Sequence, residues 1–222
     1  VPAGDIGVGG REIGYMAGMM KKLGNRADCV FTGKGVDNGG SLMRPQATGY
    51  GTVYFTQEML ALRHESLDGQ QVSVSGSGNV AQSAIEKAMQ AGARVVTASD
   101  SSGTVIDEDG FSPEKLAELM EVKNHLYGRV SDYAERVGAR FVAGIKPWEV
   151  PVDVALPCAT QNEIGAADAA ALVRNGVRCV AEGANMPATR GAARAFTEAG
   201  VLYAPGKASN AGGVAVSGLE MS

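Results

Sequence analysis

The segment from Gln71 to Asp100 places the strongest constraint on how this chain folds. Its sequence, QVSVSGSGNVAQSAIEKAMQAGARVVTASD, contains an apolar run, a glycine turn, a helical pattern and a second apolar run that ends on an acid. This order of strand, turn, helix and strand is typical of a βαβ unit that binds a dinucleotide. A GxGxx[GA] string alone is a weak signal in a chain with 31 glycines, so the prediction depends equally on the flanking runs.

The small residues of the turn each have a predicted role. Gly76 permits a tight turn out of the strand, Gly78 leaves room for a pyrophosphate, and Ala81 lets the helix sit close to the sheet. The helix N-terminus offers unpaired N–H groups and the positive end of its dipole to phosphates. We therefore predict that the pyrophosphate is held by Gly76, Ser77, Gly78, Asn79 and Val80.

The rest of the chain alternates between short apolar runs and helical patterns. This alternation predicts an α/β fold built on a doubly wound, mostly parallel sheet of Rossmann type, with helices on both faces. Strands without a period of two agree with a sheet that is covered on both sides. The predicted strands are residues 139–143, 152–156, 177–181 and 201–204, and the predicted helices include 9–23, 48–63, 129–137, 163–175 and 188–199.

Capping residues predict where several helices begin and end. Ser112, Pro113 and Glu114 have the order of an N-cap, a first-position proline and a first-turn acid, and the helix that they open ends near Lys123. Glycines are expected at the C-terminal ends of four other helices, because glycine readily adopts the left-handed conformation found there. These glycines are Gly24, Gly138, Gly176 and Gly200.

The glycine-rich, irregular segment 30–46 predicts a connection between two lobes. We accordingly divide the chain into three parts. Residues 1–45 are the end of a substrate domain with the connection, 46–205 are the dinucleotide-binding domain, and 206–222 are a return segment that lines the cleft. The chain lacks an initiator Met, so we interpret it as part of a longer protein.

Composition excludes several classes of partner. A net charge of −4 without a basic run gives no sign of nucleic-acid binding, and no apolar segment approaches the roughly 20 residues that span a bilayer. No histidine, cysteine or acid cluster has metal-ligand spacing, so we predict no metal. Cys29, Cys158 and Cys179 are odd in number and form no CxxC pair. They are expected to be buried thiols in a reducing, cytoplasmic compartment.

Ligands of a doubly wound sheet bind beyond the carboxyl ends of its strands. Neutral hydrogen-bonding side chains gather after the predicted strands, as a nicotinamide, ribose or adenine edge requires. The alternative is that these side chains cap the next helices, and for Asn162 both interpretations stand because it directly precedes a helical pattern. The side chains in question are Thr160, Gln161, Asn162 and Asn185.

The choice of cofactor depends on the end of the second predicted strand. Asp100 taken alone favours NAD, because an acid there usually holds the ribose 2′-OH and repels the extra phosphate of NADP. Ser101 and Ser102 can donate to a phosphate, however, and Lys123 could fold back toward the same place. The alternative for Lys123 is a solvated lysine at a helix end. The residues by themselves leave the choice open.

Four segments around the glycine turn carry a family resemblance. They are residues 2–7 (PAGDIG) with 9–12 (GGRE), 41–51 (SLMRPQATGYG), 182–187 (EGANMP), and 210–214 (NAGGV) with 217–222 (SGLEMS). In that order they resemble hexameric glutamate dehydrogenase, most closely the bacterial NADP-dependent type. The resemblance covers essentially the whole chain.

The resemblance implies reversible oxidative deamination of L-glutamate to 2-oxoglutarate and ammonium, with a hydride passing to or from the nicotinamide. It implies that Asp5 is the catalytic carboxylate, which moves protons to and from the amine nitrogen and suits a glycine-lined, partly desolvated setting. The alternative is a loop aspartate that caps the helix at 9–23. It also implies that Ser217 binds a substrate carboxylate, with Gly4 and Asn210 in the same cleft.

The resemblance also implies a set of cofactor contacts. Thr48 and Asn185 match residues that hold the nicotinamide carboxamide and ribose. Ala159 and Thr160 are expected to face the cofactor as well, because they directly follow the predicted strand 152–156. The SDSSG segment (residues 99–103), which includes Asp100 and Ser101, resembles NADP-type members more than NAD-type ones when it is taken together with Lys123. We therefore expect NADP, with NAD the less favoured cofactor.

One departure from the family concerns its lysines. The family's substrate lobe carries glycine-flanked lysines upstream of the PAGD segment, and that lobe is absent from this sequence. Lys34 superficially resembles one of them, but it follows Asp5 instead of preceding it. We therefore expect the cofactor-binding portion of the enzyme, with little or no turnover alone and a hexamer only in the full-length protein. The alternatives are a leucine-, valine- or phenylalanine-type dehydrogenase and a non-catalytic dinucleotide-binding module.

Overall fold

The computed structural model describes residues 2–5, 7–26 and 31–221. Cys29, one of the three thiols that we expected to be buried, lies outside this range, as do Ile6 and Ser222 of the segments that carry the resemblance. The other two thiols, Cys158 and Cys179, are buried as predicted. No helix in the described part of the chain is long and apolar enough to cross a membrane.

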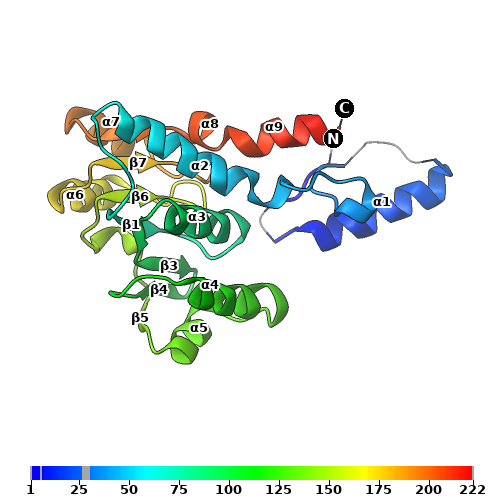
Figure 1. Ribbon diagram of the computed structural model, residues 1–222, viewed down its shortest axis with the longest axis horizontal. Helices are drawn as coiled ribbons and strands as arrows, with labels where there is room; N and C mark the ends of the chain where they lie inside the picture. The colour runs from blue at the N-terminus through cyan, green and yellow to red at the C-terminus, as the bar shows by residue number, and fades with distance from the viewer. Residues whose placement is uncertain (1, 6, 27–30, 222) are drawn as a thin grey trace.

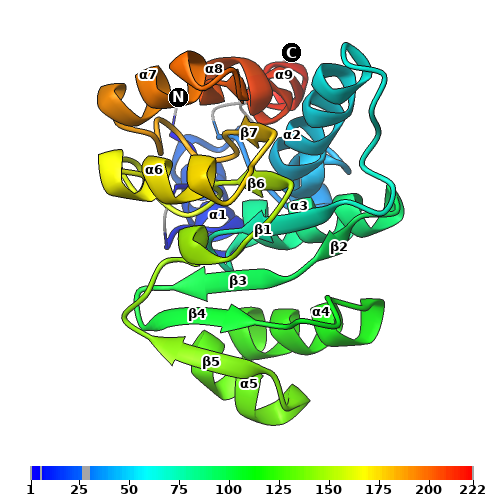
Figure 2. The same ribbon diagram turned by 90° about the vertical axis from the view of Figure 1, so that its left-hand side faces the viewer.

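The centre of the fold is a five-stranded sheet in the order β2-β1-β6-β7-β8 (Figures 1 and 2). All of its neighbouring strands are parallel, which confirms the mostly parallel α/β prediction. Successive side chains point to opposite sides of the sheet, and every residue of the central strands β6 and β7 is buried, so both faces are covered there. The strands are β1 (Gln71–Val74), β2 (Arg94–Val95), β6 (Val154–Leu156), β7 (Cys179–Ala181) and β8 (Leu202–Ala204).

Each face of the parallel sheet is covered by a pair of helices. On one face, Val154 and Leu156 of β6 belong to the hydrophobic core with the helices α2 (Arg44–Ala61) and α3 (Asn79–Gln90). On the other face, Ala155 of the same strand packs in the core with α6 (Ala166–Arg174) and α7 (Arg190–Glu198). The strand order and this two-sided cover are those of a doubly wound sheet.

A second, antiparallel sheet corrects part of the sequence prediction. It has the order β3-β4-β5 and consists of β3 (Thr97–Asp100), β4 (Gly103–Ile106) and β5 (Arg140–Ala143). The predicted second strand of the βαβ unit therefore divides: β2 pairs with β1, whereas β3 pairs with β4. The run at 139–143 belongs to this sheet and not to the parallel one, and β4 was not predicted.

A glycine at the start of β4 allows this second sheet to form. Gly103 has a φ of +153°, and a Cβ there would lie 2.3 Å from the carbonyl oxygen of Val142 on β5. The turn at residues 101–102 thus returns the chain directly alongside β3. The helices α4 (Pro113–Met120) and α5 (Val130–Val137) follow, with a π-helical turn, η2 (Glu121–His125), between them. Figure 2 shows both helices beside the small sheet.

The N-terminal helix buries only a narrow face. In α1 (Gly10–Gly24), Ile13 and Ala17 are buried, whereas Met16 and Met20 are 39% and 50% exposed. The expected cap at Gly24 is also wrong. The helix continues through that residue and Asn25 takes the left-handed conformation, with a φ of 47°, because asparagine tolerates this region better than most residues.

Two further helix starts differ from the sequence prediction. Helix α2 begins at Arg44, four residues before the expected start, because Pro45 occupies its first turn. Helix α6 begins at Ala166, where Gly165 is the N-cap and donates its N–H to Asp168. Asn162 therefore does not cap this helix; it has a φ of 57° in the preceding loop. The caps expected at Ser112 and Gly138 are confirmed.

The chain ends in two consecutive helices, α8 (Gly206–Ser209) and α9 (Ala211–Glu220), which lie along α2 (Figure 1). The packing of α9 on α2 is close, because a Cβ at Gly212 would lie 2.4 Å from the carbonyl oxygen of Ala47. Between β5 and β6 the chain forms a 3-10 turn, η3 (Pro147–Glu149), and a similar turn, η1 (Val36–Asn38), precedes α2. The return of α9 to α2 positions the C-terminal residues near the predicted cleft.

Candidate functional site

The glycine turn after β1 has the backbone conformation that the sequence predicted. Gly76 has a φ of +86°, and a Cβ there would lie 3.0 Å from the carbonyl oxygen of Cys158 and 3.2 Å from the Cα of Ala159. The Gly76 N–H donates to Ser99 Oγ at 2.9 Å, and the Ser99 N–H donates to the Gly76 carbonyl at 3.0 Å. A larger residue would therefore be strained and crowded at once.

The N-terminus of α3 is open where a pyrophosphate is predicted to bind. Gly78 is the N-cap, and a Cβ at this position would meet no described atom within 4 Å. The first N–H groups of a helix have no acceptor within it, so those of residues 79–81 are free of intrahelical bonds. The Asn79 side chain donates to the carbonyl of Pro45 at 2.5 Å, and Ala81 is fully buried against the sheet. This arrangement fits an anion-binding helix N-terminus.

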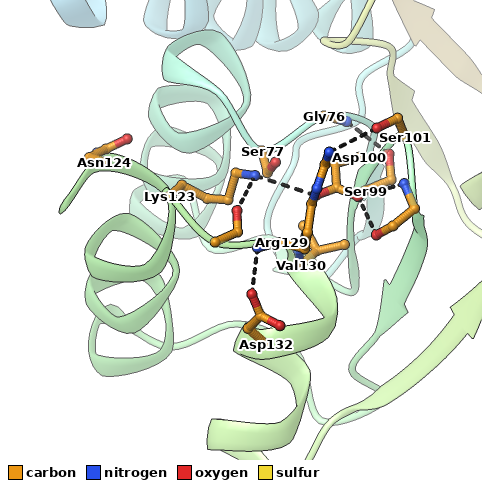
Figure 3. A network of polar contacts seen from close by, with 12 residues as sticks. Gly76, Ser77, Ser99, Asp100, Ser101, Lys123, Asn124, Arg129, Val130 and Asp132 are labelled. Carbon is orange, nitrogen blue, oxygen red and sulfur yellow. Dashed lines mark hydrogen bonds and ion pairs between the residues drawn. The ribbon is translucent and has the colours of Figure 1, made fainter. Parts of the chain in front are cut away.

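Asp100 is the acid that left the choice of cofactor open. Both of its carboxylate oxygens are bound by neighbouring residues (Figure 3). Its Oδ1 accepts hydrogen bonds from the N–H and the hydroxyl of Ser102, at 2.8 and 2.5 Å. Its Oδ2 accepts from the Val130 N–H at 3.0 Å and lies 3.3 Å from Lys123 Nζ. Burial opposes ionisation, but these hydrogen bonds and the Lys123 charge together hold the pKa of Asp100 below its ordinary value.

Lys123 folds back to the end of β3, as the sequence analysis considered. Besides the contact with Asp100, its ammonium donates to the carbonyl of Gly128 at 2.8 Å. The ammonium therefore lies beside Asp100, and Figure 3 shows it pointing toward the same region as Ser77 of the glycine turn. The alternative of a fully solvated lysine at a helix end is wrong.

Arg129 is a site residue that the sequence analysis missed. Its guanidinium donates through Nη1 to Ser101 Oγ at 2.9 Å, and Figure 3 shows it beside Asp100. Arg129 is the N-cap residue of α5, 28 residues from Ser101 in the sequence. Arg129 could not be found from sequence, because an exposed arginine that follows a glycine has no sequence pattern that distinguishes a ligand-binding arginine from a solvated one. The π-helical turn that carries the chain back to Ser101 was not predicted either.

The loops after β6 and β7 contact each other, and the loop after β6 also lies against Gly76 of the glycine turn. The Asn162 N–H donates to the carbonyl of Met186 at 2.9 Å, and the N–H groups of Gly183 and Ala184 both donate to the carbonyl of Pro157. The expected cofactor contacts Ala159, Thr160 and Asn185 lie in these two loops. Thr48, from the first turns of α2, lies against α9: a Cβ at Gly213 would be 2.2 Å from Thr48 Oγ1.

Glu163 joins the loop after β6 to the end of β1. Its Oε1 accepts from the Ser75 hydroxyl at 2.9 Å and from the Ala159 N–H at 3.1 Å. Burial raises the pKa of Glu163 to about 7, although these hydrogen bonds and the charge of Lys146 favour the ionised form. From sequence, Glu163 was predicted only to begin a helix, because no neighbouring residue indicates that its side chain reaches β1.

Glu182 holds the loop after β7 in a similar way. The side chain is almost completely buried and accepts from the Tyr203 hydroxyl at 2.7 Å, the Gly206 N–H at 2.7 Å and the Ala188 N–H at 3.1 Å. Asn185 follows three residues later and accepts from Asn210 Nδ2 at 2.9 Å. The loop after β7, α8 and the start of α9 are thereby fixed to one another.

The residues expected to bind substrate lie on two separate segments. Asp5 is exposed, and its backbone pairs with Val8 in a narrow turn. It does not cap α1, because the N-cap is Gly9, whose N–H donates to the Glu12 carboxylate at 2.9 Å. The capping alternative is therefore wrong, and the described residues do not supply the partly desolvated setting that we expected for Asp5.

Ser217 of α9 accepts a hydrogen bond from Arg44 Nε at 2.7 Å. Arg44 is the first residue of α2, four residues before Thr48, so the two helices that pack together also share a polar contact. Gly4 lies close to the backbone of the Asp5 turn, since a Cβ there would be 2.7 Å from the Val8 carbonyl. Within the described residues, no group of three or more His, Cys, Asp or Glu side chains is arranged to hold a metal ion.

The sequence matches the Glutamate/Leucine/Phenylalanine/Valine dehydrogenase family over residues 39–222. The chain is 67% identical over its whole length to the NADP-specific glutamate dehydrogenase of Salmonella typhimurium, of which it covers 50%. It is 59% identical, again over all of its residues, to the NAD(P)-specific glutamate dehydrogenase of Xylanibacter ruminicola, of which it also covers 50%. The chain thus spans about half the length of the curated relatives it matches.

A solved structure of glutamate dehydrogenase from Plasmodium falciparum has the same fold. It superimposes with a TM-score of 0.94 at 47% identity, over 99% of this chain and 47% of the other. The likeness in three dimensions therefore extends over the parallel sheet, the antiparallel sheet and the terminal helices together.

Proposed function

The chain belongs to the Glutamate/Leucine/Phenylalanine/Valine dehydrogenase family, and from that premise we propose that it is the cofactor-binding half of an NADP-dependent glutamate dehydrogenase. The full-length protein would interconvert L-glutamate with 2-oxoglutarate and ammonium. Both curated relatives described above are glutamate dehydrogenases, and the names of both include NADP.

The observation that supports NADP is that the Asp100 carboxylate is already bound by other residues of this protein. A free carboxylate at the end of β3 would repel a 2′-phosphate, but this carboxylate already accepts four contacts from Ser102, Val130 and Lys123. Arg129 adds a positive charge at the Ser101 hydroxyl, and Lys123 places another beside Asp100. With the Asp100 charge offset by Lys123, the second cation, Arg129, and the Ser101 hydroxyl favour a phosphate over a ribose hydroxyl.

Residues of the glycine turn would bind the rest of the dinucleotide. The open N-terminus of α3 at Gly78 would receive the pyrophosphate through backbone N–H groups. Thr48, Ala159, Thr160 and Asn185 would orient the nicotinamide, which supplies or accepts the hydride when it is bound. Holding the ring in one orientation selects the face that meets the substrate, so these contacts govern the geometry of the reaction.

Asp5 and Ser217 would act on the substrate. Asp5 would accept a proton from the amine nitrogen during deamination and return it during amination, as a carboxylate within hydrogen-bond reach can do. Ser217, held by Arg44 at 2.7 Å, would donate to a substrate carboxylate, with Gly4 and Asn210 lining the same cleft. A polar pocket of this kind favours glutamate over the apolar side chains of leucine, valine or phenylalanine.

We also propose that the full-length protein is a cytoplasmic homohexamer, as the family resemblance suggests. Chromatography with light scattering on the full-length protein would test the assembly, and a monomer or dimer at working concentration would refute it.

The cofactor proposal is tested by calorimetric titration of the protein with NADPH and with NADH. We expect NADPH to bind more tightly, because only its 2′-phosphate reaches Lys123 and Arg129. Equal affinities for the two cofactors would refute the proposed phosphate site, and the absence of binding for both would refute the dinucleotide site itself.

A further inference from the structure

A buried ion pair joins two segments that carry none of the residues proposed to bind the pyrophosphate or the 2′-phosphate. Lys34 Nζ lies 2.9 Å from Glu220 Oε1, and the two side chains are only 4% and 0% exposed. Lys34 is the lysine that stands between two glycines but follows Asp5 in the sequence. Glu220 is the last residue of α9. The pair therefore connects residues 186 positions apart.

Backbone groups complete the environment of both charges. The Glu220 carboxylate also accepts from the N–H groups of Gly33 and Lys34, each at 3.0 Å. The Lys34 ammonium donates in addition to the carbonyl of Phe31. Burial opposes ionisation of Glu220, but the two N–H groups and the ammonium hold its pKa below the ordinary value. The pair is thus a fully satisfied buried cluster, in which loss of one partner leaves the other unpaired.

The Lys34 side of the pair is attached to the segment that carries Asp5. The Thr32 N–H donates to the carbonyl of Pro2 at 3.2 Å, and Ala3 and Thr32 form a parallel bridge. Phe31 packs in a small hydrophobic cluster with Ile13 and Ala17 of α1, the helix that follows the Asp5 turn. Any displacement of Gly33 and Lys34 is therefore passed to residues on either side of Asp5.

The Glu220 side of the pair is attached to the segment that carries Ser217. Residues three apart on a helix share a face, so Glu220 and Ser217 lie one turn apart on the same side of α9. Arg44 holds Ser217, and at the other end of the helix Asn210 donates to Asn185. Glu220 joins the C-terminal end of α9 to the backbone of Gly33 and Lys34. Figure 1 shows this end of α9 approaching the N-terminal segment.

We propose that the Lys34–Glu220 pair is a positioning pair that sets the separation of Asp5 and Ser217 across the substrate cleft. Neither residue touches the substrate; each acts through the segment to which it is attached. The inference rests on the proposed glutamate reaction, because Asp5 and Ser217 are given their roles there. It predicts that the pair governs the reaction with substrate and leaves the distant 2′-phosphate contacts unaffected.

The test uses the full-length enzyme, and NADP-dependent turnover of glutamate by the wild type is measured first. An inactive wild type would refute the proposed function, and this result is distinguishable from failure of the present inference, which requires an active wild type. We expect Glu220→Gln and Lys34→Met each to lower kcat/KM for glutamate by about 100-fold, the loss that a misplacement of about 1 Å can cause. The dissociation constant of NADPH should stay at the wild-type value. The double variant should be no worse than the more affected single variant, because each change removes the same contact.

A matched control is Lys115→Met. Lys115 of α4 pairs at 2.7 Å with Asp107, the residue that follows β4. Neither residue belongs to the segments that carry Asp5 and Ser217, so the loss of Lys115 should leave kcat/KM for glutamate unchanged. A second readout is hydrogen exchange of the Gly33 and Lys34 amides, which donate to two different oxygens of Glu220. Exchange should become faster for at least one of them in Glu220→Gln, because glutamine keeps only one acceptor oxygen. Lys34→Arg keeps the charge and should retain more activity than Lys34→Met.

Three results would overturn the inference. The first is an unchanged kcat/KM in both Glu220→Gln and Lys34→Met while wild-type enzyme is active. The second is an equal loss of NADPH affinity and of kcat/KM, since the pair would then support the whole fold and not the cleft alone. The third is failure of both single variants and of Lys34→Arg to fold, which assigns the pair the same general role.

Discussion

Replacing Lys123 with methionine should separate the affinities for NADPH and NADH. The side chain keeps its length but loses the ammonium that lies 3.3 Å from Asp100 Oδ2. A charge-assisted hydrogen bond to a phosphate contributes about 1.5–3 kcal/mol, which corresponds to a roughly 10- to 100-fold weaker binding of NADPH. The Asp100 carboxylate also loses its nearest cation, so its repulsion of the phosphate places the expected effect toward the larger value.

NADH carries no 2′-phosphate, and its dissociation constant should change little in the same variant. The ratio of the two dissociation constants therefore falls by nearly the whole loss in NADPH affinity. Calorimetric titration of both cofactors into wild type and Lys123→Met measures this ratio directly. Lys115→Met is the matched control, because it removes a lysine from the preceding turns of the same region without approaching Asp100.

The reasoning would be refuted if Lys123→Met bound NADPH as tightly as the wild type. It would equally be refuted if the affinities for NADPH and NADH fell together, because the lysine would then support the loop at Gly128 and not a phosphate. The hydrogen bond from Lys123 to the Gly128 carbonyl makes this second outcome a specific alternative.

Three other changes test separate parts of the account. Gly76→Ala should lower the free energy of unfolding by about 1–2 kcal/mol from the left-handed backbone alone, and by more because of the Cys158 carbonyl at 3.0 Å; urea unfolding measures it, and no loss would contradict the strain. Asp5→Asn in the full-length enzyme should abolish most turnover with normal NADPH affinity, and preserved turnover would remove the assigned role. Burial raises the pKa of Glu163 from 4.5 to about 7, so its protonated form stabilises the fold below pH 4.5 and this contribution is lost as the pH rises through about 7. Glu163→Gln should remove that decline from the unfolding free energy measured against pH, and an unchanged profile would show that Glu163 is not its source.

The βαβ unit could be predicted from sequence because local signals agree with one another there. The apolar run before Gly76, the small residues of the turn and the helical pattern after it all specify the same structure. The conformation of Gly76 follows from a requirement of the turn itself. The parallel sheet could be predicted for the same reason, since its strands and helices alternate at regular spacing.

The antiparallel sheet could not be predicted because its signals are short and nonlocal. β4 contains only four residues between two turns, and an apolar run of this length does not indicate which strand it pairs with. The division between β2 and β3 leaves no break in the apolar run that contains both. Only the pairing of β4 with β3 and β5 determines that this part of the chain leaves the parallel sheet.

The orientation of Asp100 depends on residues far from it in the sequence. Val130 supplies a backbone N–H from the start of α5, and Lys123 an ammonium from η2. Arg129 reaches Ser101 by the same return of the chain. From sequence, Asp100 favoured NAD and Lys123 favoured NADP. Only the tertiary structure shows that the two residues form one cluster. Lys34 was recognised as unusual for its two glycines, but its partner Glu220 could not be found from spacing.

The central claim is that the full-length protein is an NADP-dependent glutamate dehydrogenase with this chain as its cofactor-binding half. The measurement that tests it most directly is the initial rate of cofactor reduction by the full-length protein with L-glutamate as the amine donor. The account predicts rapid reduction of NADP⁺, slower reduction of NAD⁺, and little reaction when L-leucine replaces glutamate. No reduction with glutamate, or a faster reaction with leucine, would contradict it.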